Sequence, residues 1–388
     1  MQIDKSSWEK VKLIDVVTKK EENDKENAKN RFERFIKVEH LDAESLHIKR
    51  WGNQGKDELP PTFYKVFRKG QVLFPTRNPH LRRTALASFD GICGEKTLTL
   101  DTNEEKVLSV FLPFLFHSNG FYQHTTSSIV GSTNPHVRWR DVADYEFLLP
   151  PKDQQEKLAE LLWAMEEVVK KEVDVLLKLK LAYLVKIEKQ LLNNNSKKTY
   201  LRDLGVTIRG VGFKPNELLD NYSDTACLIL RSNNISDAKI NFDKVISLPL
   251  SNVKNNQRLK LGDFAICMSN GSKDLVGKSA KIIESTFNNI SIGSFCAGFR
   301  ANDKLSEQLL EHLFASESYR QIIRRLLSGS AINNLKPSDI EGVYFRLDEQ
   351  MISRSLLELE ILKTNIKNTE IAISEAKSLK KSLINQIF

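Results

Sequence analysis

The sequence has 388 residues, of which 40% are hydrophobic and 28% are charged, so it is long enough for two or more domains with buried cores. This composition is typical of a globular protein, and the apolar runs are too short to cross a membrane. The polar N-terminus lacks the pattern of a signal peptide. We therefore expect a cytoplasmic protein without a membrane partner.

The formal net charge is +8, and its distribution matters more than the total. The basic excess lies mainly in residues 196–347, whereas residues 150–195 and 348–388 carry balanced charges of alternating sign. Balanced, alternating charges suit helices that contact other proteins. A modest basic excess permits nucleic-acid binding but does not establish it.

The four cysteines are far apart and have no paired spacing. This arrangement favours buried, reduced thiols over a zinc site. The cysteines are Cys93, Cys227, Cys267 and Cys296.

Residues 1–149 are predicted to form a first globular segment that mixes short strands and helices. Strands are expected where apolar and β-branched residues cluster between turn signals, and a helix is expected over a longer apolar run. The predicted elements are strands at 35–38, 67–74 and 85–89, a helix at 107–120 and a polar loop at 123–128.

Residues 150–195 are predicted to form one long helix. Pro150 and Pro151 suit a helix start, and no further glycine or proline follows before the polar run that ends the stretch. Apolar residues recur every seven positions, which gives the narrow stripe of a coiled-coil helix. The stripe consists of Leu162, Val169, Leu176 and Tyr183, with Met165 and Leu179 between them.

Residues 196–347 repeat the order of the first segment, and residues 309–327 are expected to form the helix that corresponds to the one at 107–120. Gly262 follows Gly70 by 192 positions, and the sequence at 131–142 aligns without gaps to that at 329–340, which is 198 positions later. In this alignment Gly131, Ser132 and Asp141 keep their places. The chain is therefore predicted to be a diverged tandem repeat.

Residues 348–388 supply a second long helix with a similar stripe, including Leu359, Ile366 and Ile373. Each stripe needs a partner, so the two helices are expected to pair with each other in an antiparallel coiled coil. The predicted fold class is α+β, with two pseudo-repeated α/β domains joined and separated by these helices. The predicted divisions are 1–149, 150–195, 196–347 and 348–388.

The whole chain resembles the specificity subunits of type I restriction-modification systems. Four motifs in the family's order carry this resemblance. They are Leu-Pro-Pro-Lys-Asp-Gln-Gln-Glu-Lys-Leu-Ala at 149–159, Leu-Gly-Asp at 261–263 followed by Gly-Lys-Ser-Ala at 277–280, Gly-Ser-Ala-Ile-Asn-Asn-Leu-Lys-Pro-Ser-Asp-Ile at 329–340, and Leu-Lys-Lys-Ser-Leu-Ile-Asn-Gln-Ile-Phe at 379–388. The second long helix lacks the proline pair of the first, which leaves its start less sharply marked.

The resemblance implies a non-catalytic subunit with two target-recognition domains, each reading one half of a split site in double-stranded DNA. It implies that the helices set the gap between the halves and dock two modification subunits, which carry S-adenosylmethionine and methylate adenine. Restriction subunits would complete the nuclease. The chain itself is expected to need no cofactor and no metal.

Three catalytic or nucleotide-binding interpretations fit the residues poorly. The stretch 271–279 has five residues between its glycines where a phosphate-binding loop has four, and a strand rather than a helix is predicted after it. A glycine-flexed hairpin near DNA fits it better. Methyltransferase and nuclease motifs are absent from the sequence at their required spacing.

The donor-rich loops are the predicted DNA-reading sites, because Arg suits guanine edges, Asn suits adenine, and Lys and Ser more often hold phosphates. Each single residue also fits a role as a solvated loop residue or a turn former, and for any one of them that role is favoured. In the first domain the candidates are Arg77, Asn78, His80, Arg82, Arg83, His124, Asn134, His136 and Arg138. In the second they are Asn270, Ser272, Lys273, Lys278, Ser330, Asn333, Asn334 and Lys336.

The alternative is a coiled-coil scaffold that joins two protein-binding domains without nucleic acid. The sequence does not identify the DNA bases, because recognition loops vary freely on a common frame.

Overall fold

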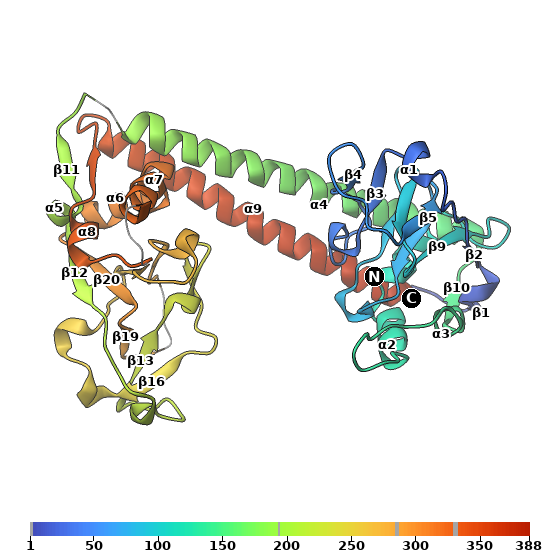
Figure 1. The fold of residues 1–388 in the computed structure, drawn as a ribbon, viewed down its shortest axis with the longest axis horizontal. Helices are drawn as coiled ribbons and strands as arrows, with labels where there is room; N and C mark the ends of the chain where they lie inside the picture. Colours follow the sequence, from blue (N-terminus) through green and yellow to red (C-terminus); the bar gives the residue numbers. More distant parts are fainter. Residues whose placement is uncertain (1–2, 193–194, 284–286, 329–332) are drawn as a thin grey trace. The chain divides into compact units, whose positions relative to one another are not determined.

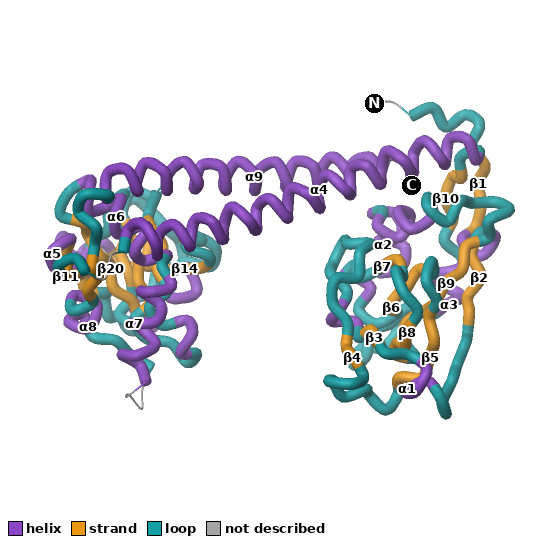
Figure 2. The backbone as a smooth tube through the Cα atoms, turned by 90° about the horizontal axis from the view of Figure 1, so that it is seen from above, coloured by secondary structure: helices purple, strands orange, loops and turns teal. Residues whose placement is uncertain are grey.

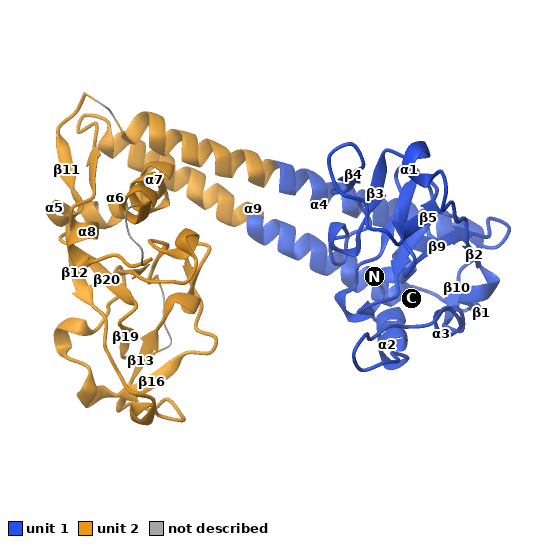
Figure 3. Cartoon of the chain, in the orientation of Figure 1, with its two compact units in different colours: residues 1–174, 370–388 blue, residues 175–369 orange. Residues whose placement is uncertain are grey.

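The computed structural model describes residues 3–192, 195–283, 287–328 and 333–388. The chain forms two compact units (Figure 3). Unit 1 consists of Met1–Asp174 with Glu370–Phe388, and unit 2 consists of Val175–Thr369. Each unit therefore contains one predicted globular segment and a part of each long helix (Figure 1).

A four-stranded antiparallel sheet has the same strand order in both units. The order is β2-β9-β6-β7 in unit 1 and β12-β20-β17-β18 in unit 2. The strands of unit 1 are β2 (Val17–Lys20), β6 (Val72–Pro75), β7 (Ala85–Leu86) and β9 (Thr97–Thr102); those of unit 2 are β12 (Gly205–Arg209), β17 (Phe264–Cys267), β18 (Ser279–Lys281) and β20 (Cys296–Ala301).

A second sheet in each unit is built on one parallel pair. In unit 1, β3 (Arg34–Ile36) pairs in parallel with β8 (Gly91–Gly94), and in unit 2 β13 (Ala226–Leu230) pairs in parallel with β19 (Ile290–Ile292). The flanking strands differ between the units. They are β4 (Gly52–Asn53) and β5 (Phe63–Phe67) in unit 1, and β16 (Ile246–Pro249) in unit 2, which also has the hairpin β14 (Ile235–Ser236) with β15 (Lys239–Ile240).

A two-stranded ribbon precedes the start of each long helix. Strand β1 (Glu9–Lys12) pairs with β10 (Glu146–Leu149), and β11 (Lys198–Tyr200) pairs with β21 (Tyr344–Arg346). Because three sets of strands pair in the same way in both units, the predicted tandem repeat is confirmed.

The two long helices are α4 (Lys152–Lys186) and α9 (Ile352–Ile387), and a π-helical turn (Ile187–Leu191) extends α4. Figure 2 shows these helices in purple. Within unit 2, Lys186 forms an ion pair with Glu358, so the end of α4 lies beside the start of α9. Within unit 1, Glu166 near the start of α4 forms an ion pair with Lys380 near the end of α9. The antiparallel pairing predicted from the two stripes is thus confirmed.

The helices contribute to the core of each unit. In unit 1, Leu162 of α4 and Ile387 of α9 pack in the same cluster as Phe74 and Phe121. In unit 2, Ile187 and Leu359 pack in one cluster with Phe264, Phe299 and Tyr319. Each globular segment therefore buries apolar surface of both helices, which fixes it to the pair.

Two predicted helices differ from those observed. The predicted helix at 107–120 is a 3-10 helix at Leu112–His117 followed by α2 (Asn119–Ser127), so the predicted loop at 123–128 is mostly wrong. Ser118 begins α2 by accepting a hydrogen bond from Phe121 N. The helix was not predicted because most of its residues are polar and only its inner face is apolar.

The predicted single helix of the second segment is likewise two helices. They are α6 (Lys304–Ala315) and α7 (Glu317–Ser328), and the Ser316 hydroxyl accepts a hydrogen bond from Tyr319 N at 3.0 Å to start the second helix. The predicted strand at 85–89 is confined to β7. The short helices are α1 (Ala28–Arg31), α3 (Trp139–Ala143), α5 (Leu201–Leu204) and α8 (Pro337–Glu341).

Candidate nucleic-acid interface

In unit 1, two loops that are distant in the sequence are joined by backbone hydrogen bonds. Arg77 and His136 form an antiparallel bridge. Asn78 N donates to Pro135 O at 3.1 Å, and Val137 N donates to Thr76 O at 3.0 Å. The loop after β6 and the segment before α3 thus form one strip, which brings together the predicted residues Arg77, Asn78, Asn134 and His136.

Unit 2 contains the same pair of loops. Ser269 and Asn334 form the bridge, and Asn270 N donates to Asn333 O at 3.3 Å. The Asn333 side chain also donates to Gly271 O at 3.1 Å. The offsets from unit 1 are 269 − 77 = 192 and 334 − 136 = 198, which match the offsets of the sequence repeat.

The first loop contains unusual backbone conformations. Asn78 and Arg82 have φ values of 50° and 51° and flank the 3-10 helix Pro79–Leu81. Residues other than glycine rarely adopt this left-handed region, and they do so mostly where the surrounding structure imposes it, often at functional sites. The strip presents Arg77 and His80 as exposed side chains, whereas Arg83 donates to Val38 O at 3.2 Å.

Arg82 differs from its neighbours because its guanidinium is held inside unit 1. It donates to Glu44 Oε1 and to Asn119 Oδ1, both at 2.8 Å, and lies 5.0 Å from the centre of the Tyr122 ring. Glu44 also pairs with Lys381 of α9 at 2.7 Å. Burial opposes the ionised form of Glu44, but the two cations outweigh it and hold the pKa of this carboxyl below its usual value. Arg82 therefore connects the loop to the C-terminal helix.

The second loop is a hairpin between β17 and β18, as expected for residues 271–279. Gly277 has a φ of 77°, and a Cβ atom there would lie 2.8 Å from a side-chain carbon of Ile323. Arg320 of α7, which the sequence analysis did not select, donates to Val276 O at 3.0 Å and to Asp274 O at 2.8 Å. These contacts hold a loop that exposes Ser272 and Lys273 and leaves Lys278 half-buried. Strand β18 follows where a nucleotide-binding loop needs a helix.

The remaining predicted residues lie apart from these bridges or beside them. His124 Nε2 is hydrogen-bonded to Asp141 O at 2.6 Å and its ring lies 5.2 Å from that of Tyr145, so it joins α2 to α3. Arg138 directly precedes α3, and Lys336 directly precedes α8. Each lies two positions after a bridged residue, His136 in unit 1 and Asn334 in unit 2. Ser330 lies outside the described residues.

One of the bridged loops also contacts a segment that the sequence analysis did not select. The Asn270 side chain donates to Ser232 Oγ at 3.4 Å, which links the hairpin to the segment after β13. Ser232 follows a buried strand. Its position directly after an apolar run is the sequence feature from which it could have been selected.

All four cysteines are buried free thiols, as predicted. Within the described ranges, no three or more His, Cys, Asp or Glu side chains are grouped to hold a metal ion. None of the helices in the described part of the chain is long and apolar enough to span a membrane.

No protein-family model matches this chain. Two curated proteins are similar over part of it. The specificity subunit of the type I restriction enzyme StySPI from Salmonella potsdam is 30% identical over 175 residues, which cover 45% of this chain and 37% of that protein. The specificity subunit of the EcoKI enzyme from Escherichia coli K12 is 33% identical over 134 residues, which cover 34% of this chain and 28% of that protein. The matched stretches therefore span less than half the length of each relative.

Solved structures match over nearly the full chain. The S subunit of a type I restriction-modification system from M. genitalium has a TM-score of 0.56 and 13% identity, and the match covers 100% of this chain and 98% of that one. A chain from a structural study of assembly and conformational transition in the type I system has a TM-score of 0.60 and 18% identity, with coverage of 98% and 97%. The chain has the fold of a type I specificity subunit. The fold class and the resemblance predicted from the sequence are thereby confirmed.

In this specificity-subunit fold, the long helices also expose apolar side chains in both units. In unit 1, Leu161 and Val168 of α4 are 40% and 51% exposed, although they directly precede the buried Leu162 and Val169. In unit 2, Leu177 and Leu181 of α4 are 61% and 63% exposed. Exposed apolar side chains of this kind are candidates for contact with other proteins.

Proposed function

We propose that this chain is the DNA-recognition subunit of a type I restriction-modification complex and that each unit reads one half of a bipartite site. The observation that carries this proposal is the pair of bridged loops at the same topological position in both units. The frame is the same, but Arg77 and His136 occupy the bridge in one unit and Ser269 and Asn334 in the other. Different donors on a repeated frame are what two different half-sites require.

The chemistry of the complex belongs to its partners in this proposal. The chain supplies recognition without catalysis and without a cofactor of its own. Two modification subunits with S-adenosylmethionine methylate adenine in the recognised site, and restriction subunits add cleavage. The curated relatives are named as specificity subunits of type I restriction enzymes, and one similar solved chain comes from a study of complex assembly in a type I restriction-modification system, which supports this assignment.

The exposed apolar residues of the long helices are the proposed docking surfaces for the modification subunits. In unit 2, Leu177 and Leu181 of α4 are accompanied by Leu357 and Ile361 of α9, which are 65% and 53% exposed. In unit 1, α9 adds Leu379, which is 64% exposed. A helix pair with exposed apolar residues in both units offers two sites for two copies of one partner.

The proposal is tested by expressing the chain with its modification subunit in a host that lacks the system and sequencing the methylated bases. The expected result is methylated adenine in a bipartite motif with a fixed unread gap. Binding to a modification subunit without methylation of any DNA motif would instead support the protein scaffold and overturn the recognition role.

A further inference from the structure

Two of the four cysteines lie directly opposite each other in unit 2. Cys267 ends β17 and Cys296 begins β20, and the two residues are partners in the antiparallel ladder. Both belong to one buried cluster, where they are 0% and 3% exposed. Cys93 and Cys227 lie in two other clusters. The chain therefore holds one pair of thiols and two single thiols.

The backbone around the pair brings the two side chains close together. Cys267 N donates to Lys278 O at 2.9 Å, and Cys267 O accepts from Gly277 N at 2.8 Å, so both backbone groups point away from β20. In such a non-hydrogen-bonded pair the Cα atoms are about 4.5 Å apart and the side chains share one face. Disulfides span Cα separations of about 4.4–6.8 Å. The two thiols are thus placed for a disulfide at the short end of this range.

The same position of the ladder in unit 1 has no thiols. There Pro75 of β6 is the partner of Thr97 of β9, and 267 − 75 = 192 is the offset of the sequence repeat. The two sheets have the same strand order, so a cysteine pair is not needed to form this part of the fold. The pair is a feature of unit 2 alone at this position.

The surroundings of the pair favour ionisation of one thiol. A hydrogen bond from the Cys296 thiol, together with the charge of Lys278, lowers the pKa of Cys267 although burial opposes this shift. The same hydrogen bond and burial raise the pKa of Cys296. Burial raises the pKa of Cys93 to about 12 and that of Cys227 to about 11. Because the thiolate is the nucleophile, Cys267 is the expected attacking group.

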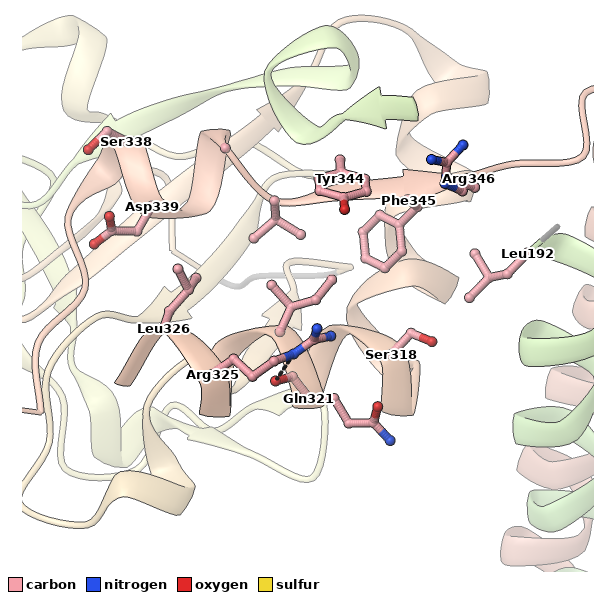
Figure 4. A pocket seen from close by; sticks show the side chains of 13 residues that line it. Leu192, Ser318, Gln321, Arg325, Leu326, Ser338, Asp339, Tyr344, Phe345 and Arg346 are labelled. Carbon is pink, nitrogen blue, oxygen red and sulfur yellow. Dashed lines mark hydrogen bonds between the residues drawn. The ribbon is translucent and has the colours of Figure 1, made fainter. Parts of the chain in front are cut away.

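The location of the pair favours a small oxidant. The open groove of unit 2, of about 620 Å³, is walled by α7, α8 and β21 (Figure 4), and neither cysteine lines it. The pair lies instead at the end of β17, next to Phe295, which is 70% exposed. Oxidation of a thiol depends on access to its sulfur atom. A hydroperoxide, which needs little more room than water, therefore fits this position better than a bulky disulfide.

The pair is connected to the second DNA-reading loop. Cys267 Sγ lies 3.5 Å from Ser269 O, and Ser269 forms the bridge to Asn334. Met268 N and Ser269 N donate to Phe295 O at 2.9 and 3.0 Å. A disulfide brings the two sulfur atoms to about 2.05 Å, so its formation moves the strand ends that carry this loop.

We propose that Cys267 and Cys296 form a reversible disulfide when the protein meets a hydroperoxide, and that this bond weakens DNA reading by unit 2. The effect on DNA rests on the proposed function, whereas formation of the disulfide does not. Such a bond makes the reading of one half-site sensitive to oxidation and leaves the other half-site unaffected.

The reaction is a two-electron oxidation of the thiol pair. The Cys267 thiolate attacks one peroxide oxygen, the O–O bond breaks, and a sulfenic acid and hydroxide form; the hydroxide takes a proton to become water. The Cys296 sulfur then attacks the sulfenic sulfur, the S–S bond forms, and the S–O bond breaks with loss of a second water. With hydrogen peroxide, two thiols become one disulfide and the peroxide becomes two waters. A dithiol reverses the step by thiol–disulfide exchange.

Formation of the bond is tested by treating the full chain with hydrogen peroxide, denaturing it in acid and alkylating the remaining thiols with N-ethylmaleimide. Mass spectrometry of unreduced peptides should show Cys267 linked to Cys296 within one chain, while Cys93 and Cys227 are alkylated. Dithiothreitol should restore alkylation of the pair. Alkylation of all four cysteines to the same extent, or a disulfide between two copies of the chain, would overturn the proposal.

Two conservative variants identify the attacking thiol. In Cys296→Ser the serine hydroxyl keeps a hydrogen-bond donor beside Cys267, so peroxide should leave a sulfenic acid on Cys267 that dimedone labels. In Cys267→Ser, Cys296 should stay unlabelled. The opposite pattern would contradict the assignment of Cys267 as the nucleophile.

The effect on reading is measured with the chain in complex with its modification subunit and a duplex that carries the methylated motif. Oxidation should weaken binding about tenfold, which is about 1.4 kcal/mol, and dithiothreitol should restore it. Discrimination should fall at the second half-site only, and the Cys296→Ser complex should not form the disulfide or lose affinity. A disulfide-linked complex with unchanged affinity would overturn the effect on reading. A reduced complex that binds no specific DNA would instead overturn the proposed function, and the mass spectra would still decide whether the disulfide forms.

Discussion

Arg77 and Arg82 lie in one loop but have different surroundings. Arg77 is exposed on the strip that its backbone forms with His136. Arg82 is bound to Glu44 and Asn119 and lies over the Tyr122 ring. Their shared sequence context gave both the same predicted role, whereas the contacts assign a structural role to Arg82.

Arg77→Ala is expected to relax the first half of the methylated motif and leave the second half unchanged. The loss of one base contact costs about 1–3 kcal/mol of discrimination. Arg82→Ala is expected to leave the motif unchanged and to lower the free energy of unfolding by about 1 kcal/mol, because partly exposed ion pairs contribute little. Methylome sequencing and urea unfolding measure the two effects. If the Arg82 variant also relaxed the first half-site, Arg82 would be a DNA-reading residue after all.

His117 and His312 are buried histidines, one in each unit. His117 Nε2 is hydrogen-bonded to Thr84 O at 3.0 Å, and His312 Nδ1 to the Tyr183 hydroxyl at 2.8 Å. Burial lowers the pKa of each to about 4. His312 also faces Glu360 at 3.4 Å, and Glu311, Lys363 and Lys281 act on it, so its neighbours carry both signs of charge.

Both histidines are expected to make stability depend on pH between about 6.5 and 4. In this window the unfolded chain binds protons that the folded chain does not, so the free energy of unfolding falls as the pH falls, by up to about 1.4 kcal/mol per pH unit for each histidine. Urea unfolding at several pH values measures the slope. His312→Gln should reduce it, and an unchanged slope in His117→Gln with His312→Gln would assign the acid sensitivity to other groups.

The long helices carry an apolar pairing stripe and, in addition, exposed apolar residues. Leu176 and Ile366 are half-buried residues of the pairing stripe within unit 2. Leu177 and Leu181 are mostly exposed on the same helix. Neighbouring residues of one helix would thus separate pairing of the helices from the proposed docking of the modification subunit.

Leu176→Asp with Ile366→Asp is expected to cause aggregation, because two carboxylates would be placed where the helices meet. Leu177→Asp with Leu181→Asp is expected to leave the chain folded but to abolish its complex with the modification subunit. Size-exclusion chromatography with static light scattering distinguishes these outcomes. A soluble first double mutant that still assembles would contradict the pairing.

At the scale of the whole molecule, both helices continue from one compact unit into the other. Helix α4 passes from unit 1 to unit 2 after Asp174, and α9 passes back after Thr369. Residues 187–191 pack in the core of unit 2, so an insertion at the end of α4 would disturb that unit. Changes of helix length are better made at the two crossing points.

Insertion of Leu-Ala-Glu-Lys after both Asp174 and Thr369 is expected to widen the unread gap of the DNA site. Four helical residues add about 6 Å, and DNA rises about 3.4 Å per base pair, so the gap should grow by one or two pairs. Both half-sites should be unchanged, because neither insertion touches a loop. Methylome sequencing gives the gap, and an unchanged gap in a folded variant would show that the helices do not measure it.

Local patterns in the sequence determined the main architecture. The seven-residue stripes, the proline pair and the repeated segments at 131–142 and 329–340 were sufficient to predict two long antiparallel helices and a tandem repeat. These features are visible locally because helix periodicity and turn chemistry act over a few residues. Because such patterns act only locally, the sequence analysis predicted a loop where α2 lies. The polar composition of this segment hid the burial of Phe121 and Tyr122, which stabilises the helix.

Only the tertiary structure shows which of the predicted hydrogen-bond donors lie close together. Arg77 and His136 are joined by backbone hydrogen bonds between segments 136 − 77 = 59 residues apart, while Arg82 is withdrawn by a contact with Glu44 and, through it, with Lys381. Such pairings depend on long-range packing and on the volume of neighbouring side chains, which no local pattern encodes.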